Sequence, residues 1–342
     1  MGGSVSAPDV TLSKERTFLI TGANTGIGYE IAKGIARSGG SVIIACRSED
    51  KAKEAIEKMK KEIQEEFDQK QVDKTDEVAA PSINVQYMHL DLSSLKSVID
   101  FVKKYKESGL PLHVLICNAG VFVADKELTS DGFEKHFQVN YLSHFLLTLH
   151  LLPLIKRSGP NSRIVNVSSK GHWFAEFNLE NIQAQKSFHV NTFYGNSKLF
   201  QIMSMYQLSK RLDKETVSVF SVHPGFVDTN ILKFGTGFLQ FTIDLAVRFG
   251  MARKPVSGAV GPLIAALHPS LNGETALYFS EEKQKPPFDM ARDEAKQEII
   301  WTYSLQCLKG YLNDDVLEEI GLKLEDIQTL EEARDPTIGT EI

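Results

Sequence analysis

Short apolar runs alternate with longer amphipathic stretches along most of this chain. The short runs are rich in β-branched and aromatic residues and end at glycine or polar residues, which is typical of buried strands. The longer stretches repeat their apolar residues at helical spacing. We expect strands at 17–21, 41–46, 84–90, 113–120, 163–169, 217–225 and 276–280, and helices near 27–38, 49–67, 94–107, 131–157, 196–212 and 257–267.

The order of these elements predicts an α/β fold with a single, doubly wound parallel sheet. The strands are apolar almost without interruption, which indicates that helices cover both faces of the sheet. One domain over residues 15–310 accounts for this pattern, after a flexible leader at 1–14. Residues 64–82 are polar and lack periodicity, so we expect a surface loop there. Residues 311–342 are acidic and weakly patterned, which predicts a solvated tail with at most one helix.

Composition narrows the classes of function. The chain has 342 residues, of which 42% are hydrophobic and 24% charged, as in an ordinary globular protein. The net charge of −6, without a basic stripe, argues against a nucleic-acid partner. Three widely spaced cysteines and nine histidines without ligand spacing argue against disulfides and metal sites. This cysteine usage favours a reducing, cytoplasmic compartment.

The N-terminus bears on location. Its first residues, MGGSVS, fit the N-myristoylation pattern, with Gly2 as the acylated residue and Ser6 at the required position. A flexible leader without a lipid would read similarly. No apolar run reaches membrane-spanning length without polar interruption. A lipid on Gly2 would place the protein peripherally on the cytosolic face of an internal membrane.

The segment TGANTGIG directly follows the first expected strand and opens the first expected helix. Glycines in such a loop let backbone amides approach a pyrophosphate, and the helix N-terminus directs its positive dipole toward the anion. A tight turn without a ligand is the alternative, but the position between strand and helix favours a dinucleotide site. The expected phosphate-loop residues are Gly22, Asn24, Thr25, Gly26, Ile27 and Gly28.

Two further positions bear on the cofactor. At the end of the second strand an acid would bind a ribose 2′-hydroxyl, whereas an arginine would accept a 2′-phosphate. The sequence has Arg47 there, which favours NADP(H) over NAD(H); the alternative is a surface arginine that pairs with a nearby acid. Asp91, after the third strand, could bind the adenine amine or cap the helix that begins near Leu95.

A tyrosine and a lysine four positions apart share one face of a helix. The spacing alone does not identify a reaction centre, because it occurs three times, at Tyr29 with Lys33, Tyr194 with Lys198, and Tyr206 with Lys210.

Only Tyr194 has neighbours suited to chemistry. Asn118, Ser169 and the Pro224-Gly225 turn each follow an expected strand. In an open parallel sheet, ligands bind outside the carboxyl ends of the strands, so these residues should gather in one crevice. We expect Tyr194 to lie over the same crevice, whereas Tyr206 belongs to the core or the surface.

The motifs TGANTGIG, CNAG, QVNYLSHF, NVSS, YGNSK and HPG occur in that order over about residues 16–230. In this order they resemble the short-chain dehydrogenase/reductases, which implies a Rossmann-type fold. Within that family, VIIACR, PLHVLICNAG, DGFEKHFQVNYLSHFLLT and SRIVNVSS resemble the retinol dehydrogenase group, with the WW-domain oxidoreductase and the chromosome-X dehydrogenase/reductase linked to polyprenol metabolism. Cys117 is a departure, because many relatives have asparagine there.

The resemblance implies a role for each residue of the centre. Tyr194 would be the general base or acid, and the Lys198 ammonium, together with an oxidised nicotinamide, would lower the pKa of the phenol. Lys198 would also hold the nicotinamide ribose, Ser169 would bind the substrate oxygen with Ser168 as second choice, and Asn140 would link Lys198 to a water chain. Further cofactor contacts are expected from Asn118, Ala119, Gly120, Pro224, Gly225 and Thr229.

The substrate is expected to be lipophilic. Residues 231–250 are rich in Phe and Leu, and the resemblance places a substrate flap at about 226–255, which suggests a retinoid, steroid or polyprenoid alcohol, aldehyde or ketone. The alternative is a helix that only packs on the sheet. Two other functions stay open: a non-catalytic cofactor-binding scaffold or sensor, and a nucleotide-sugar epimerase, whose usual G-x-x-G-x-x-G loop is absent. By analogy with the family, we also expect a homo-oligomer.

Overall fold

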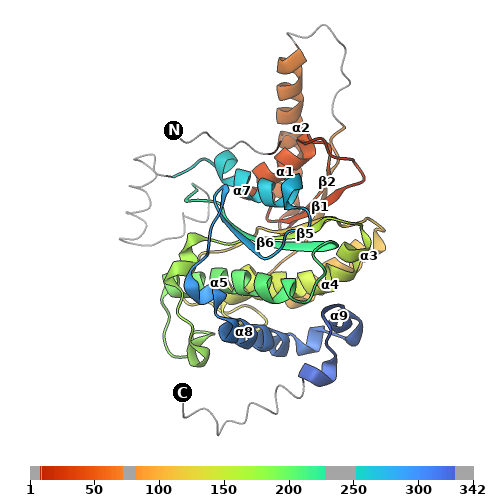
Figure 1. Cartoon of the computed structure of the whole chain (residues 1–342). Helices are drawn as coiled ribbons and strands as arrows, with labels where there is room; N and C mark the ends of the chain where they lie inside the picture. Colours follow the sequence, from red (N-terminus) through yellow and green to blue (C-terminus); the bar gives the residue numbers. More distant parts are fainter. Residues whose placement is uncertain (1–7, 9, 72–81, 228–251, 328–342) are drawn as a thin grey trace.

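An eight-stranded sheet runs through the middle of the protein in the computed structural model, which describes residues 8, 10–71, 82–227 and 252–327 (Figure 1). The strand order is β3-β2-β1-β4-β5-β6-β7-β8, and every pairing is parallel except the last, between β7 and β8. The strands are β1 (Thr17–Thr21), β2 (Ser41–Cys46), β3 (Val85–His89), β4 (Val114–Cys117), β5 (Ser162–Val167), β6 (Val217–His223), β7 (Leu277–Ser280) and β8 (Lys283–Gln284). The expected doubly wound sheet is confirmed.

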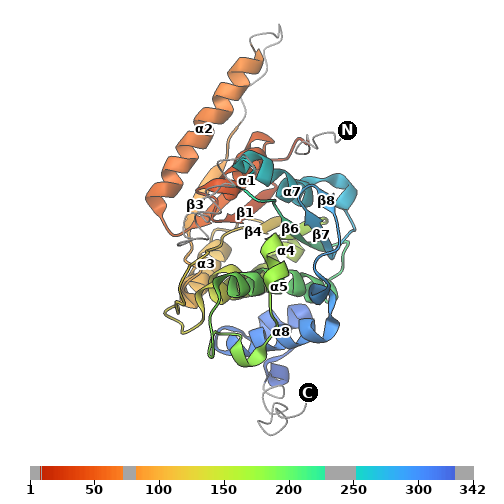
Figure 2. The ribbon, with the colours of Figure 1, turned by 90° about the vertical axis from the view of Figure 1, so that its left-hand side faces the viewer.

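Helices cover both faces of the sheet, as its fully buried strands require. Figure 1 shows α1 and α7 on one face and α4 and α5 on the other, with α8 and α9 as an outer layer below α5 and α4. Figure 2 shows α2 extending past the body of the protein. The helices are α1 (Gly26–Arg37), α2 (Glu49–Gln71), α3 (Leu95–Glu107), α4 (Ser143–Arg157), α5 (Val190–Ser209), α7 (Pro255–Leu267), α8 (Glu294–Cys307) and α9 (Asp314–Leu317).

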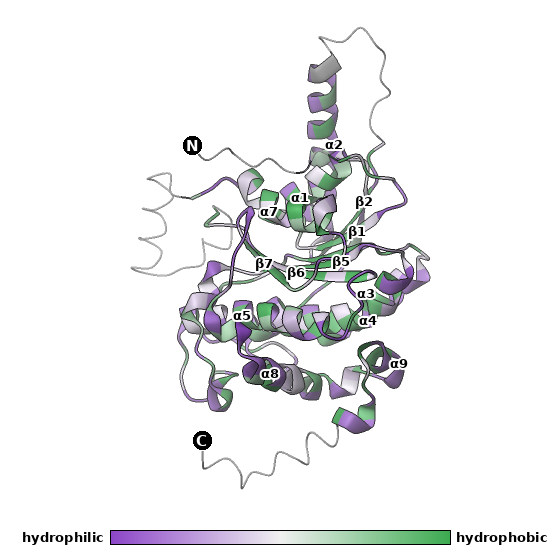
Figure 3. Ribbon diagram, viewed as in Figure 1, coloured by the Kyte–Doolittle hydropathy of each residue, from purple (hydrophilic) through white to green (hydrophobic). Residues whose placement is uncertain are grey.

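The hydrophobic core consists of two buried clusters, one on each side of the sheet. Figure 3 shows hydrophobic residues concentrated along the strands and hydrophilic residues over α2. Among the described residues, no helix has the length and the apolar character that a bilayer crossing requires.

The order of strands places the site. Chain order reverses between β1 and β4, which are neighbours although two strands and their helices separate them in sequence. A ligand crevice forms at such a switch point, outside the carboxyl ends of the strands. The segments that follow β1, β4, β5 and β6 therefore meet at this edge.

Several boundaries differ from the expectation. Helix α5 begins at Val190 rather than near 196, so Tyr194 lies in its second turn. The long apolar helix near 131–157 starts with a π-helical segment, η1 (Phe137–Leu142), before α4. Helix α2 continues to Gln71, into the stretch expected to be a loop.

The C-terminal region also differs, since residues 311–327 were expected to be solvated. Val316, Leu317, Ile320 and Ile327 are buried and belong to the core cluster on the α4–α5 side. These four apolar residues make the segment part of the packed body, while Glu318, Glu325 and Asp326 between them are exposed.

Candidate active site

The glycine loop joins β1 to α1. Helix α1 begins at Gly26, its N-cap residue Thr25 makes no side-chain capping hydrogen bond, and its first turn has no acidic residue. The backbone N–H groups in the first turn of a helix that has no side-chain cap can bind an anion instead. Gly26 has a φ of 59°, in the left-handed region that favours glycine. The expected residues Asn24 and Ile27 are partly exposed in the same loop.

Thr21 connects this loop to the segment after β4. Its Oγ1 accepts hydrogen bonds from the amides of Asn118 and Ala119, at 3.0 and 2.9 Å. Gly28 packs against the same segment so closely that a Cβ there would lie 2.5 Å from the Asn118 Nδ2. The TGANTGIG and CNAG motifs thus form one packed unit, and Gly28 is required for contact within the protein itself.

A buried histidine completes this unit. The Nε2 of His144 lies 2.8 Å from the Thr21 Oγ1, and its Nδ1 lies 3.1 Å from the Asn140 carbonyl. A carbonyl only accepts, so Nδ1 carries the proton and Nε2 accepts from the Thr21 hydroxyl. Burial lowers the pKa of His144 to about 4, which keeps the ring neutral.

Asn140 lies within η1 and faces the segment after β4. Its Oδ1 accepts from the Val121 amide at 2.7 Å, and its Nδ2 donates to the Val121 carbonyl and to the Ser197 Oγ, both at 3.0 Å. Gly120 borders this group, because a Cβ there would lie 3.3 Å from the Asn140 Oδ1 and 3.5 Å from the Lys198 Nζ. The water chain between Asn140 and Lys198 stays a prediction.

Lys198 is buried in α5, with 3% of its surface exposed. Its Nζ donates to the Val167 carbonyl at 3.0 Å and to the Gln201 Oε1 at 3.1 Å. Burial lowers the pKa of Lys198 to about 7. The same Nζ lies 5.8 Å from the centroid of the Tyr194 ring, one turn earlier on α5.

Tyr194 and Ser169 meet at the end of β5. Their side chains lie close enough for Ser169 to lower the pKa of the phenol, and the Ser169 Oγ accepts from the Gly171 amide at 3.0 Å. Ser168 is buried and donates to the Lys198 carbonyl at 2.8 Å, so its hydroxyl is committed within the protein. Ser169 is therefore the serine that lies beside the phenol.

In the protein alone the pKa of Tyr194 is raised, whereas the resemblance implies that Lys198 and an oxidised nicotinamide together lower it. Burial raises the pKa of the phenol, and the neighbouring Ser169 side chain lowers it by less. The Lys198 ammonium, which donates to the Val167 carbonyl and the Gln201 Oε1, is not among the groups that shift the pKa of Tyr194.

The other two tyrosine–lysine pairs have structural contacts. The Tyr29 hydroxyl and the Lys33 Nζ both bind the Glu62 carboxylate, at 3.0 and 2.8 Å, which joins α1 to α2. Lys33 is therefore ion-paired and holds a structural contact rather than a catalytic one. Tyr206 packs against the core, and Lys210 forms an ion pair with Glu294 at 3.2 Å.

Arg47 and Asp91 follow β2 and β3. Arg47 is exposed and makes no hydrogen bond or ion pair with any residue that the structure describes. The Asp91 Oδ1 accepts from the Ser93 amide and hydroxyl, at 2.9 and 2.7 Å, and so holds the turn before α3. The N-cap of α3 is Ser94, so Asp91 does not cap that helix itself.

The Pro224-Gly225 turn follows β6. Gly225 has a φ of 94°, and a Cβ there would lie 2.8 Å from the Arg253 Cδ, so glycine is required. Arg253 in turn pairs with Glu281 and Glu282. Thr229 and the flap segment 231–250 lie outside the described residues.

Sequence reasoning did not single out Thr21, Glu134, His136 or His144, all of which contact the site. The last three lie in the apolar run at 137–155 or in its N-terminal flank, where a polar residue must find a partner when buried. Polar residues in or beside such an apolar run are the sequence signal from which these three could have been identified. Within the described ranges, no three His, Cys, Asp or Glu side chains gather as a metal site.

Known proteins share both sequence and fold with this chain. A sequence profile of the short chain dehydrogenase family matches residues 16–83 and 75–236. Human polyprenol dehydrogenase is 34% identical over 85% of this chain and 84% of its own, and mouse retinol dehydrogenase 14 is 36% identical over 86% of each. A solved structure of an uncharacterized Mycobacterium paratuberculosis protein matches with a TM-score of 0.66 and 28% identity, covering 90% of this chain and 98% of its own. The Pseudomonas aeruginosa RhlG/NADP complex matches with a TM-score of 0.59 and 22% identity, covering 80% and 96%, which supports the fold.

Proposed function

This chain belongs to the short-chain dehydrogenase family, and from that premise we propose that it is an NADP(H)-dependent oxidoreductase. Its reaction would interconvert a lipophilic alcohol and its aldehyde or ketone. The observation that carries this proposal is the meeting of Tyr194, Ser169 and the buried Lys198 at the carboxyl end of β5.

The residues around the switch point fit a dinucleotide. The first turn of α1 has no side-chain cap, which suits the pyrophosphate, and Arg47 has no competing partner among the described residues, which suits a 2′-phosphate. Asp91 would bind the adenine, while Asn118 to Gly120 and the Pro224-Gly225 turn would border the nicotinamide half. The bound nicotinamide supplies or accepts the hydride.

The chain's own groups then handle the proton. Tyr194 would donate its hydroxyl proton to the carbonyl oxygen during reduction and accept it from the alcohol during oxidation. Ser169, which lies beside the phenol, would steady the charge that develops on the substrate oxygen. Lys198 would favour the phenolate when its ammonium is charged, and its pKa of about 7 keeps that charge responsive to the site.

A lipophilic substrate is supported by the aromatic residues next to Ser169. Trp173 and Phe174 lie in η2 (Lys170–Phe174), the segment that Ser169 caps, and are 55% and 65% exposed. Exposed large aromatic side chains often mark a binding surface. Relatives named for retinol and polyprenol, and the apolar sequence at 231–250, support the same substrate class.

The test is NADPH consumption with a panel of lipophilic carbonyls, namely a retinal, a polyprenal and a steroid ketone. Tyr194→Phe should lower kcat by about 10²-fold or more, the usual size of a general acid–base contribution, without loss of NADPH binding. Tyr206→Phe is the matched control and should retain activity, because its ring packs on the core. Equal losses in both variants would contradict the assignment. NADPH binding without turnover of any carbonyl would instead favour a cofactor-binding sensor.

A peripheral position on an internal membrane would bring the enzyme to such a substrate. Acylation of Gly2 would supply one weak anchor, and a single myristoyl chain binds only marginally. Intact-mass measurement and fractionation of wild type and Gly2→Ala from eukaryotic cells test this. An unacylated Gly2, with both proteins distributed equally, would leave a cytosolic enzyme.

A further inference from the structure

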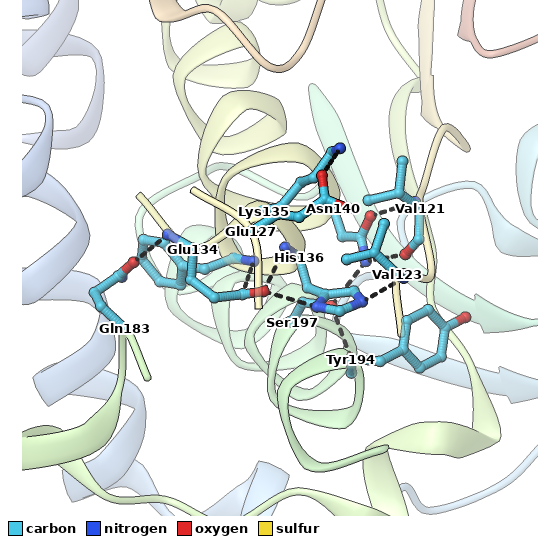
Figure 4. Close-up of polar contacts among 11 residues, drawn as sticks. Val121, Val123, Glu127, Glu134, Lys135, His136, Asn140, Gln183, Tyr194 and Ser197 are labelled. Carbon is cyan, nitrogen blue, oxygen red and sulfur yellow. Dashed lines mark hydrogen bonds and ion pairs between the residues drawn. The ribbon is translucent and has the colours of Figure 1, made fainter. Parts of the chain in front are cut away.

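A buried glutamate–histidine pair lies beside Tyr194 (Figure 4). The side chains of Glu134 and His136 are both 0% exposed. The Glu134 carboxylate accepts from the amides of His136 and Phe137, at 3.0 and 2.8 Å, and lies 2.7 Å from the His136 Nδ1. These three contacts satisfy a buried charge that would otherwise be costly.

The contacts define the tautomer of His136. The Val123 amide donates to the His136 Nε2 at 3.0 Å, so Nε2 carries the lone pair. Nδ1 must then carry the proton and donate it to the Glu134 carboxylate. Glu134 therefore maintains the tautomer of His136 whose Nε2 can accept a hydrogen bond from the Val123 amide.

The segment from Val121 to Val123 is held at both ends by η1 and the residue before it. Asn140, one helical turn after His136, binds the Val121 amide and carbonyl, while His136 binds the Val123 amide. Phe122 lies between these two attachments. Its ring packs edge-on against the Tyr194 ring, with centroids 5.2 Å apart, and the His136 ring lies 6.1 Å from the same tyrosine.

We propose that His136 is a positioning residue, which fixes the 121–123 segment so that Phe122 holds the Tyr194 ring in its reactive orientation. Glu134 contributes by setting the tautomer of His136. This inference rests on the proposed function, because ring orientation matters to the reaction only if Tyr194 transfers the proton. Displacement of a reacting group by about 1 Å can cost about 10²-fold in rate, so a loosened Phe122 should be measurable.

The experiment uses two replacements of His136 that differ in reach. In His136→Asn the short amide lies near the place of Nδ1, so it can bind Glu134 and leaves the Val123 amide without an acceptor. In His136→Gln the longer side chain reaches the place of Nε2 and restores that acceptor. Hydrogen exchange of the Val123 amide, kcat, the KM for NADPH and the melting temperature are measured for each.

We expect His136→Asn to accelerate Val123 exchange up to about tenfold, the equivalent of one hydrogen bond, and to lower kcat at least tenfold. The KM for NADPH should stay within about twofold, and His136→Gln should recover most of both losses. His150→Asn is the matched control, because His150 is also largely buried, and its Nε2 binds the Tyr311 carbonyl at 2.8 Å. It should lower the melting temperature without changing kcat or Val123 exchange.

Unchanged Val123 exchange in His136→Asn would overturn the inference, whatever the activity. Faster exchange with a wild-type kcat would overturn the positioning role and leave the proposed function standing. Full activity of Tyr194→Phe would overturn the proposed function instead. If His136→Asn does not fold, Glu134→Gln replaces it, since it keeps the shape of the side chain; a wild-type kcat and wild-type exchange in that variant would again overturn the inference.

Discussion

The Lys198 ammonium reduces the stability of the folded protein, because its side chain is buried and its pKa falls to about 7. A lysine in an unfolded chain has a pKa of about 10.4. Between these values the unfolded chain binds more protons, so the contribution of Lys198 to stability rises with pH from about 7 to 10. A buried cation with this cost is typical of a functional site.

Lys198→Met should therefore stabilise the protein while it inactivates the enzyme. The pKa shift corresponds to roughly 4–5 kcal/mol at pH 7, and the unpaired Val167 carbonyl would take back about 1–3 kcal/mol. We expect the free energy of unfolding to rise by about 1–4 kcal/mol at pH 7, measured by denaturant titration. The gain should diminish as pH approaches 10, and a variant less stable than wild type at pH 7 would contradict this account.

Arg47→Ala tests the choice of cofactor. A charge-assisted contact with a 2′-phosphate contributes about 1.5–3 kcal/mol, so the affinity for NADPH should fall about 10–100-fold. The affinity for NADH should not change, because NADH lacks the phosphate. Fluorescence titration of both cofactors measures this, with Arg157→Ala, an exposed arginine at the end of α4, as control. Wild-type NADPH affinity in Arg47→Ala would make Arg47 an ordinary surface arginine.

Among single residues, the sequence identifies those that belong to a recognisable motif. It misses those whose role depends on contact with a residue that is distant in sequence. Tyr194 and Lys198 stand out by their spacing and their neighbours, and the structure brings them together with Ser169. His144 has no such mark, because its role depends on Thr21, 123 residues away in sequence. Only the folded chain shows that the two side chains meet.

Among the elements, α8 shows why a helix can escape detection from sequence. It buries residues at a regular helical spacing, but two of the five, Gln297 and Ser304, are polar. Each is satisfied inside the protein: the Gln297 Nε2 donates to the Ala291 carbonyl at 2.9 Å, and Ser304 binds the Tyr141 hydroxyl at 2.8 Å. The hydropathy pattern is therefore broken where the packing pattern is intact. The seven parallel strands, which are largely apolar, were predictable to within a few residues, whereas the short, exposed and polar β8 was not.

Trp301→Ala tests whether α8 is integral to the fold. Trp301 is 1% exposed, lies edge-on to the Phe145 ring with centroids 4.9 Å apart, and has the Arg211 guanidinium 4.5 Å from its ring. Its truncation should cost about 3–5 kcal/mol of unfolding free energy. The chain's other tryptophan, Trp173, is 55% exposed, and Trp173→Ala should cost about 1 kcal/mol or less. Equal losses would show that α8 packs only loosely.

For the whole molecule, buried histidines make stability depend on pH. Burial lowers the pKa of both His144 and His223 to about 4, against about 6.5 when unfolded. Below pH 6.5 the unfolded chain therefore takes up protons that the folded chain resists, so this stability is full above pH 6.5 and is lost as pH falls toward 4.

Each of these two histidines should account for roughly 3 kcal/mol by pH 4. Unfolding measured from pH 7 to 5 should show a steep decline before most carboxylates titrate. His223→Asn, which keeps an acceptor near the place of the Nδ1 that binds the Lys170 amide, should make the decline shallower. Replacement of the exposed His89 by Gln should leave it unchanged. A flat profile in wild type would contradict this account.

Helices α8 and α9 cover the outer sides of α5 and α4, and they belong to the same chain (Figure 1). Were a second subunit to cover this surface, mass action would uncover it on dilution. A tethered segment instead binds at an effective concentration set by its linker, on the order of millimolar, however dilute the protein is. The coverage of α4 and α5 by this layer should accordingly persist over a dilution of about 100-fold, a range in which a mass-action effect is easily seen by hydrogen exchange of the covered helices. A homo-oligomer would then have to assemble through another surface. In this respect the C-terminal region gives the chain, within one polypeptide, the stability that other proteins obtain by association.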